Sequence, residues 1–394
     1  MLFLQITLLC LLLLWLFAMI SAYGYGTLGR RLRSMESVVA ATEPLPPLSV
    51  VIPAHNAAAR LRHQLTTILE QDYERFEVIV VDMGSTDDTK DVLERLEQKY
   101  AHLTHTFTPQ SARDISLDRL ALTLGIRAAS YEWVVITHSD CVPLSSGWLT
   151  RIGETIVHPK RSPQSPYLST PDLVLGIARY EDGHASWLER KASFMRLWNN
   201  IAAVNHVLSG HAAVSCEACN IAIRKAFFLE KGGFMLGQDL KAGAEELLVN
   251  QDSTLHNTAL LLVPAGTVVQ QRLHHPGQWQ KLRLFYAETR RHQRHTTLFR
   301  LKRWLRLSLP WLMLLTLVPV VLTRSFIALG VYALLLFIYG CFKIYHFNLT
   351  ASQLGCHSYY LTLWLFELWL PIWDLKAWLN HRMASKNQFR KKFV

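Results

Sequence analysis

The chain has 394 residues, half of them hydrophobic, which is enough for one large domain together with membrane segments. Its net charge of +11 is concentrated in short basic runs, and the run over 290–306 holds seven Lys or Arg and no acid. That run comes directly before an apolar segment, so it indicates contact with anionic lipid headgroups or simply a cytoplasmic flank, and nucleic acid is not an expected partner.

The amino-terminal segment predicts a membrane anchor. Residues 1–29 carry no charged side chain, and the apolar run over 2–20 is long enough to span a bilayer. A cleaved signal peptide is the alternative, but no basic residue precedes the run, and the run is long for such a peptide. Three arginines over 30–33 mark the cytoplasmic side. We therefore expect a transmembrane anchor over 1–29 and a juxtamembrane linker over 30–47.

The next hundred residues alternate apolar runs with segments of helical spacing. This alternation predicts an α/β domain with a mainly parallel sheet and helices on both faces. Asp140 is expected to end the last of these strands, at the sheet edge where ligands bind in open α/β folds. The stretches 48–56 and 76–89 are each expected to begin with a strand that ends in polar or acidic residues, and further strands are expected over 103–107 and 133–140. Helices are expected over 58–70, 88–100 and 116–129.

Beyond residue 148 the pattern loosens. The sequence predicts a loop over 161–171, a strand over 174–180 and a helix over 187–207. Cys216 and Cys219 form an isolated C-x-x-C, which offers too few ligands for a zinc site, so we expect free thiols in a reducing compartment.

The carboxyl-terminal region predicts further membrane segments. Two apolar stretches separated by three residues predict a helical hairpin over 307–342. A third stretch, 359–379, is interrupted by charges and rich in tryptophan, which favours an interfacial or re-entrant position. The basic tail over 386–392 is then expected on the cytoplasmic side. These features predict a multi-pass protein of the cell membrane with a cytoplasmic catalytic domain.

Several motifs together resemble a known family. Residues 50–56 (VVIPAHN) and 78–89 (VIVVDMGSTDDT) resemble the opening of the family-2 glycosyltransferases, whose fold is the GT-A nucleotide-sugar fold. Residues 137–141 (THSDC) lie where that family has its acidic DxD-type motif. The resemblance continues through 219–225 (CNIAIRK) on the acceptor side, 243–248 (GAEELL) at the catalytic acidic pair and, weakly, 288–292 (ETRRH) at the QxxRW-type motif.

The resemblance covers 48–295 and implies a GT-A catalytic domain over 48–300, followed by a membrane region over 301–394. It also implies inverting transfer of a sugar from a nucleotide-diphosphate donor. Asp140 would hold Mg²⁺ or Mn²⁺, because hard oxygen ligands suit these ions and the ion neutralises the departing pyrophosphate. Nucleotide-sugar contacts are expected from Pro53, His55, Asn56, Asp82, Arg119, Ser139 and Asp140, acceptor contacts from Asn220 and Arg224, and pyrophosphate contacts from Arg290, Arg291 and His292.

The catalytic base is expected to be Glu245 or Glu246, because an acceptor hydroxyl must lose its proton to a nearby carboxylate. Neighbouring residues on a helix point about 100° apart, so only one of the two can face the donor. Counting from Gly243 favours Glu245. For both residues, a solvated helix face is the alternative interpretation.

Other residues also keep alternative interpretations. Asp140 could cap a helix, Asp82 could close a turn, and His138 could be a core histidine. Arg290 and Arg291 could face lipid only.

The motifs depart from the family pattern at Met83, His138, Ala244, Glu288 and His292. The leading interpretation is a membrane-anchored glycosyltransferase that acts on a lipid-linked or membrane-proximal glycan. A soluble or peptidoglycan-like acceptor stays open, as does a degraded member that binds a nucleotide sugar or a partner enzyme without catalysis. A polymer-extruding synthase is not expected, because two or three carboxyl-terminal segments are few for a channel.

Overall fold

The computed structural model describes residues 2–36, 44–109, 116–159, 170–181, 186–234, 240, 242–271, 276–294, 296–322 and 324–385. The chain divides into two compact units: Met1–Ser37 with Thr296–Lys376, and Val38–His295 with Ala377–Val394. Most of the predicted loop over 161–171 and all of the basic tail over 386–392 lie outside the described residues.

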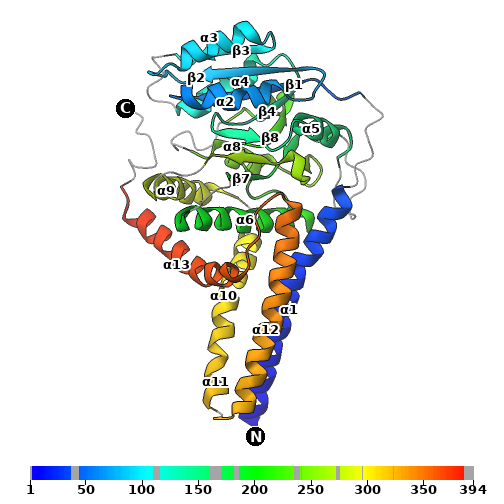
Figure 1. Cartoon of the computed structure of the whole chain (residues 1–394), viewed down its shortest axis with the longest axis vertical. Coiled ribbons are helices and arrows are strands. Elements are labelled where there is room, and N and C mark those ends of the chain that lie inside the picture. The colour runs from blue at the N-terminus through cyan, green and yellow to red at the C-terminus, as the bar shows by residue number, and fades with distance from the viewer. Residues whose placement is uncertain are drawn as a thin grey trace. The chain divides into compact units, whose positions relative to one another are not determined.

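The larger unit is built on a seven-stranded sheet with the order β3-β2-β1-β4-β8-β6-β9 (Figure 1). The first four of these strands pair in parallel, β8 runs antiparallel to both of its neighbours, and β9 is parallel to β6. The mixed, mainly parallel sheet predicted from the sequence is therefore confirmed. The strands are β1 Leu48–Ala54, β2 Phe76–Asp82, β3 Leu103–Phe107, β4 Trp133–Ile136, β6 Leu173–Leu175, β8 Ile221–Arg224 and β9 Thr258–Leu260.

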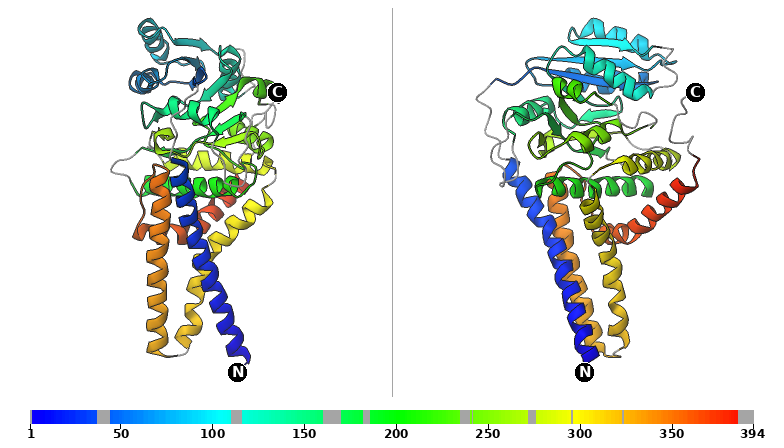
Figure 2. Two further views of the ribbon diagram at one scale, coloured as in Figure 1. Left: turned by 90° about the vertical axis from the view of Figure 1, so that its right-hand side faces the viewer. Right: turned by 180° about the vertical axis from the view of Figure 1, so that it is seen from behind.

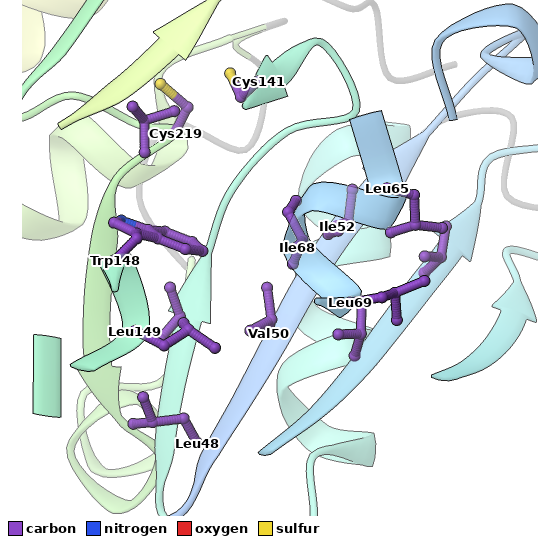
Figure 3. Close-up of a cluster of buried hydrophobic side chains, with 14 of the residues drawn as sticks. Leu48, Val50, Ile52, Leu65, Ile68, Leu69, Cys141, Trp148, Leu149 and Cys219 are labelled. Atoms are coloured by element: carbon purple, nitrogen blue, oxygen red, sulfur yellow. The ribbon is translucent and has the colours of Figure 1, made fainter. Parts of the chain in front are cut away.

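One face of this sheet forms the main hydrophobic core (Figure 3). Val50 and Ile52 of β1 point to this face, because alternate residues of a strand share a side of the sheet. Leu65 and Ile68 of one covering helix and Trp148 of another pack here, all but inaccessible to solvent. The helices on this face are α2 Ala58–Leu69, α3 Thr89–Lys99 and α5 Trp148–Val157.

The opposite face is covered by α4 (Leu117–Ala128), which lies against β1 and β2. Val51 of β1 points to this face and approaches α4 so closely that a methyl group on Gly125 would lie 2.3 Å from it. Both faces are thus buried, which explains why β1 and β2 are continuous apolar runs without polar alternation. The predicted helices on both faces are confirmed.

A second, three-stranded sheet has the order β5-β10-β7. Its strands are β5 Cys141–Pro143, β7 Ala178–Tyr180 and β10 Val268–Gln270. The strand predicted over 133–140 is wrong at its end: β4 stops at Ile136, and a turn that contains Asp140 leads into β5. After this turn the chain enters the second sheet, where β5 pairs with β10.

The strand predicted over 174–180 is also corrected. It is two short strands, β6 and β7, one in each sheet. Gly176 lies between them, where a β-carbon would come within 2.3 Å of the Asn220 amide. A larger side chain does not fit at this crossing, so the glycine permits the change of sheet.

The remaining helices of the larger unit are α6 Trp187–Leu208, α7 Lys225–Glu230, α8 Ala244–Asp252 and α9 Pro276–His292, with a 3₁₀ turn, η1, over Pro264–Gly266. Helix α6 confirms the helix predicted over 187–207. It begins with a reciprocal cap, in which the Ser186 side chain accepts from the Glu189 backbone and the Glu189 side chain accepts from the Ser186 backbone.

The smaller unit consists of long helices. Helices α1 and α12 lie side by side (Figure 1, Figure 2), with Ala18 and Ala22 of α1 fully buried. A β-carbon on Gly26 of α1 would lie 2.2 Å from His346, so small residues allow the close approach. The helices are α1 Leu2–Glu36, α10 Thr297–Leu315, α11 Leu317–Leu322, α12 Phe326–Gln353 and α13 Leu361–Met383, of which α13 continues into the larger unit.

Two helical stretches, Thr297–Leu322 and Phe326–Gln353, are long and apolar enough to cross a membrane. They meet at the turn where the sequence predicts the bend of a hairpin. Helix α1 continues to Glu36, seven residues into the predicted linker. Helix α13 covers the predicted interfacial stretch, and its interrupting acids are paired: Glu367 with buried Lys343, and Asp374 with Arg303 at 2.6 Å.

Candidate functional site

The carboxyl ends of β1 and β2 lie together, because Ala54 and Asp82 are partners in the parallel pairing. The loops that follow are joined by side chains. The Asn56 side-chain oxygen Oδ1 accepts from the Thr86 backbone at 2.8 Å, and the Asn56 backbone donates to the Ser85 hydroxyl at 2.9 Å. Asp82 accepts from the Ser85 backbone at 3.1 Å. Asn56 and Asp82 therefore fix the two loops at the edge where the sequence places the nucleotide.

The other predicted residues of these loops differ in exposure. Pro53 is buried in β1, whereas His55 is exposed at the loop. Asp87 accepts from the backbone of Ala58, and its hydrogen bond with the Thr89 hydroxyl holds the pKa of its carboxyl below the usual range. The carboxylates of the acidic run after β2 thus interact with the amino-terminal turns of α2 and α3.

Asp140 is held by a relay of side chains from distant parts of the chain. The Gln270 amide donates to Asp140 Oδ2 at 2.9 Å, and Gln270 Oε1 accepts from Arg196 Nη1 at 2.8 Å. Arg196 in turn forms a two-point ion pair with Glu217, with Nε at 3.0 Å from Oε1 and Nη2 at 2.7 Å from Oε2. The backbone of Gln271 also donates to the Asp140 carbonyl at 2.8 Å. These contacts fix the orientation of the Asp140 carboxylate. Helix α5, which follows Asp140 in the chain, begins without a side-chain cap, so Asp140 does not cap it.

His138 links this turn to the predicted catalytic acids. Its Nε2 lies 3.8 Å from Glu245 Oε1, and the Glu245 side chain is only 9% exposed. Burial alone would lower the pKa of His138, but the contact with Glu245 and the nearby Cys219 and Asp140 raise it to about 9. The imidazole therefore pairs with Glu245 as an imidazolium, and it must lose a proton before it can act as a metal ligand.

The same turn gathers ligands that suit a metal ion. One ligand atom from each of His138, Asp140 and Cys141 lies within 4.8 Å of the other two. A carboxylate suits Mg²⁺ and Mn²⁺, whereas imidazole and sulfur ligands suit softer divalent ions. The residues present therefore fit a divalent ion, through a mixed set of nitrogen, oxygen and sulfur ligands.

Cys219 lies beside Cys141 (Figure 3), and both thiols are free. Cys141 Sγ donates to Asp140 Oδ1 at 3.3 Å, while Arg196 Nη2 donates to Cys219 Sγ at 3.7 Å. A hydrogen bond from Cys141, assisted by the charge of Arg196, lowers the pKa of the Cys219 thiol against the effect of burial. The two sulfurs thus contact each other, and each has a further partner: Asp140 for Cys141 and the Arg196 guanidinium for Cys219.

Glu246 points away from Glu245, as helix geometry predicts. Its Oε1 accepts from the Gln293 amide at 3.0 Å, while its Oε2 is buried with no hydrogen-bond partner among the described residues. Burial raises the pKa of Glu246 to about 7, although the charge of Arg290 and the bond from Gln293 oppose this. Glu245 faces the Asp140 turn, and Glu246 faces the segment that follows α9.

The start of α8 requires glycine. Gly243 caps the helix at a φ of 87°, a conformation that other residues rarely adopt. A β-carbon there would also lie 2.6 Å from Thr289 of α9. Gly243 thus lets α8 begin close to α9, which sets the direction of both glutamates.

Asn220 and Arg224, the predicted acceptor residues, have partners within the fold. The Asn220 side chain donates to the carbonyls of Ile177 and Gly266 and accepts from the Trp148 indole at 3.1 Å. Arg224 pairs with Asp172 at 2.6 Å and lies opposite Trp133, at the other end of β4 from the Asp140 turn. The structure does not bring Arg224 to the Asp140 turn.

The remaining predicted residues fall in two places. Arg119 is buried in α4, and Ser139 lies partly exposed beside Asp140. Arg290, Arg291 and His292 are on the exposed last turn of α9.

Glu288, which departs from the family motif, is buried beneath that last turn of α9. It pairs with His381 at 2.7 Å, while Arg291 and His292 stand at 3.7 and 3.6 Å. The carboxylate therefore holds basic side chains from both α9 and α13.

Sequence reasoning missed the residues that support the site, namely Arg196, Glu217, Gln270 and Gln293. None of the four belongs to a motif identified in the sequence, and Gln270 acts on a residue 130 positions away. No local pattern marks them. A polar residue in a mostly apolar face of α6 is the only signal, and it applies to Arg196 alone.

Parts of the chain are similar in sequence to known proteins. Residues 49–213 match the family described as Glycosyl transferase family 2. A segment of 117 residues is 31% identical to glycosyltransferase AglE of Haloferax volcanii and covers 29% of this chain and 37% of that protein. A segment of 54 residues is 39% identical to the GalNAc(5)-diNAcBac-PP-undecaprenol beta-1,3-glucosyltransferase of Campylobacter jejuni and covers 14% of this chain and 18% of that protein.

These matches span little more than a third, or less, of the relatives' own length. The solved mannosyltransferase PcManGT of Pyrobaculum calidifontis, in complex with GDP-Man and Mn²⁺, aligns with a TM-score of 0.49 and 19% identity over 86% of this chain and 97% of that one. The match to the family-2 glycosyltransferases over residues 49–213 confirms the resemblance found in the sequence. The predicted GT-A class of α/β fold is confirmed with it, given the mixed, mainly parallel sheet.

Proposed function

We propose that the protein is a membrane-anchored glycosyltransferase that moves a sugar from a nucleotide-diphosphate donor to a lipid-linked or membrane-proximal glycan, with inversion. The observation that carries this proposal is the meeting of Asp140, His138 and Glu245 past the carboxyl ends of the parallel strands. An oriented carboxylate for a divalent ion and a second carboxylate for a proton are the two groups that such a transfer needs.

The roles follow from position. Asp140, fixed by Gln270, and His138 would hold a divalent ion, which when bound would offset the charge of the leaving nucleotide diphosphate. Glu245 would take the proton from the acceptor hydroxyl as that oxygen attacks the anomeric carbon. A single displacement of this kind inverts the anomeric carbon. Asn56 and Asp82 would shape the loops around the nucleotide.

The acceptor is proposed from the chain's apolar helices. Two of them are long and apolar enough to cross a membrane, and basic runs flank the catalytic domain over 30–33 and 290–306. The name of the Campylobacter jejuni relative specifies an acceptor linked to undecaprenol through a diphosphate. A lipid-linked acceptor would reach a catalytic domain that is tethered at the cytoplasmic face, with 1–29 as anchor and 301–394 as membrane region.

The base assignment is tested by comparing Glu245→Gln with Glu246→Gln in the full-length protein. Loss of the base should lower turnover by roughly 10²–10⁴-fold for Glu245→Gln, with donor affinity little changed. Glu246→Gln should keep most of the activity, because its side chain faces Gln293. Near-wild-type transfer by both variants would exclude both as the base.

Topology is tested by labelling single cysteines with a membrane-impermeant reagent. We expect a cysteine at Ser385 to be protected in right-side-out vesicles, since the basic flanks favour the cytoplasmic side. Labelling of that cysteine from outside would contradict the proposed arrangement.

A member that binds a nucleotide sugar, or a partner enzyme, without catalysis is the second candidate. It is favoured by the His138–Glu245 ion pair, which already occupies the proposed base, and by Met83, which replaces a family acid at the nucleotide edge. Donor binding without release of nucleotide, across a panel of sugar donors with Mn²⁺, would support this candidate over the first.

A further inference from the structure

We propose that the turn over 138–141 binds a borderline transition-metal ion, of the Co²⁺ and Zn²⁺ type, in preference to Mg²⁺. The ion would be held by the imidazole of His138, the carboxylate of Asp140 and the sulfur of Cys141. This inference rests on the proposed function in so far as both place a divalent ion at Asp140. It goes further, because it assigns two ligands beside the carboxylate and a class of ion.

The geometry of the turn is the first argument. The three ligand atoms lie within 4.8 Å of one another, and Cys141 Sγ is already 3.3 Å from Asp140 Oδ1. A zinc-like ion stands about 2.0–2.3 Å from each nitrogen, oxygen or sulfur ligand, so two ligands of one tetrahedral ion are about 3.3–3.8 Å apart. The separation of 3.3 Å between Cys141 Sγ and Asp140 Oδ1 already falls in that range, and the widest separation in the turn has to shorten by about 1 Å.

The chemistry of the ligands is the second argument. Mg²⁺ demands near-octahedral oxygen ligands, whereas among these three side chains only Asp140 offers oxygen. Imidazole and thiolate favour zinc, cobalt and similar ions over magnesium. A His138 imidazole and a Cys141 thiolate would thus shift the preference of the site away from Mg²⁺.

The support behind the ligands is the third argument. Gln270 binds Asp140 Oδ2, which leaves Oδ1 on the side of Cys141. Gln270 is itself held by Arg196, and outer partners of this kind orient metal ligands. Cys219 contacts Cys141 and accepts from Arg196, but it lies outside the group of three ligand atoms. The two neighbouring thiols therefore provide a matched pair for mutation.

The test is a titration of the full-length protein in detergent with Co²⁺, without nucleotide sugar. We expect a thiolate-to-cobalt charge-transfer band in the ultraviolet that excess Mg²⁺ does not remove. Cys141→Ser should lose the band and keep weaker Co²⁺ binding, whereas Cys219→Ser should keep the band. Asp140→Asn and His138→Gln should each weaken Co²⁺ binding at least tenfold, the lower end of the roughly 10–100-fold cost of losing even an outer-shell partner.

Circular dichroism and thermal unfolding of each variant separate a lost ligand from a lost fold, and if Cys141→Ser unfolds, the His138→Gln titration decides. The proposal is overturned if the wild type shows no thiolate band, if Cys219→Ser removes the band and Cys141→Ser does not, or if Mg²⁺ displaces Co²⁺ at comparable concentrations. Sugar transfer with Mg²⁺ and no thiolate band would refute this inference and leave the proposed function standing. A thiolate band in a protein that turns over no donor would support the site and count against the proposed function.

Discussion

Replacing Glu246 by glutamine should stabilise the protein, and the gain should grow with pH. The buried carboxyl has its pKa raised from an ordinary 4.5 to about 7, so the folded state favours the protonated form. Because the folded state holds this proton more tightly than the unfolded state does, the protonated carboxyl stabilises the fold. This stabilisation is fully present below pH 4.5 and is lost as pH rises through about 7. Glutamine resembles the neutral carboxyl and keeps an oxygen that can accept from Gln293.

The size of the effect follows from the same values. One pH unit corresponds to about 1.4 kcal/mol. Relative to its value below pH 4.5, the free energy of unfolding of the wild type is therefore lower by about 3 kcal/mol at pH 8, but by less than about 1 kcal/mol at pH 5. The advantage of Glu246→Gln should therefore grow by about 2.5 kcal/mol between these two pH values. For a unit of this size, that corresponds to a relative rise of roughly 5–10 °C in melting temperature.

The assay is thermal unfolding in detergent, followed by tryptophan fluorescence at pH 5 and pH 8. The matched control is Glu230→Gln, because Glu230 lies on the exposed end of α7. That variant should match the wild type at both pH values. A Glu246→Gln variant whose advantage is the same at pH 5 and pH 8 would refute the assignment of a raised pKa to this carboxyl.

Two further outcomes are expected. Gln270→Ala should weaken binding of a divalent ion at Asp140 by roughly 10–100-fold in a Co²⁺ titration, while Gln271→Ala should not, because only the backbone of Gln271 contacts Asp140. Gly243→Ala should cost about 1–3 kcal/mol of stability, measured as a lower melting temperature, since its φ is 87° and a β-carbon would clash with α9. Gly277→Ala is its control, because nothing lies within 4 Å of a β-carbon there, and an unchanged melting temperature for Gly243→Ala would contradict the argument.

The elements that local patterns specify were predicted well. Three of the four parallel strands, β1, β2 and β4, are mostly apolar runs, and α2, α4 and α6 have apolar residues at helical spacing, so the α/β class followed from sequence. Two strand predictions were wrong because they depended on remote partners. The run after Trp133 stays in the first sheet only to Ile136, and the run over 174–180 is divided between two sheets. An apolar sequence shows that a residue is buried, but it does not show which strand it pairs with.

The candidate site was predictable to a lesser degree. Asp140 was selected by its place after an apolar run and by the family resemblance, and Glu245 by the resemblance and its count from Gly243. The structure places His138 between them. The relay from Glu217 through Arg196 to Gln270 could not be foreseen, because side-chain contacts between segments so far apart leave no periodic pattern in the sequence.

The support of Asp140 by Gln270 has a consequence for biosynthesis. The two residues are 130 positions apart, and a ribosome adds roughly 5–20 residues each second, so Gln270 is made roughly 7–26 s after the turn that it holds. During that interval the amino-terminal strands can pair, since β1 to β4 are all synthesised. The turn that contains Asp140 lacks its hydrogen bond from Gln270 until β10 has been synthesised. The nascent domain can thus form its parallel sheet well before the turn that contains Asp140 is held in place.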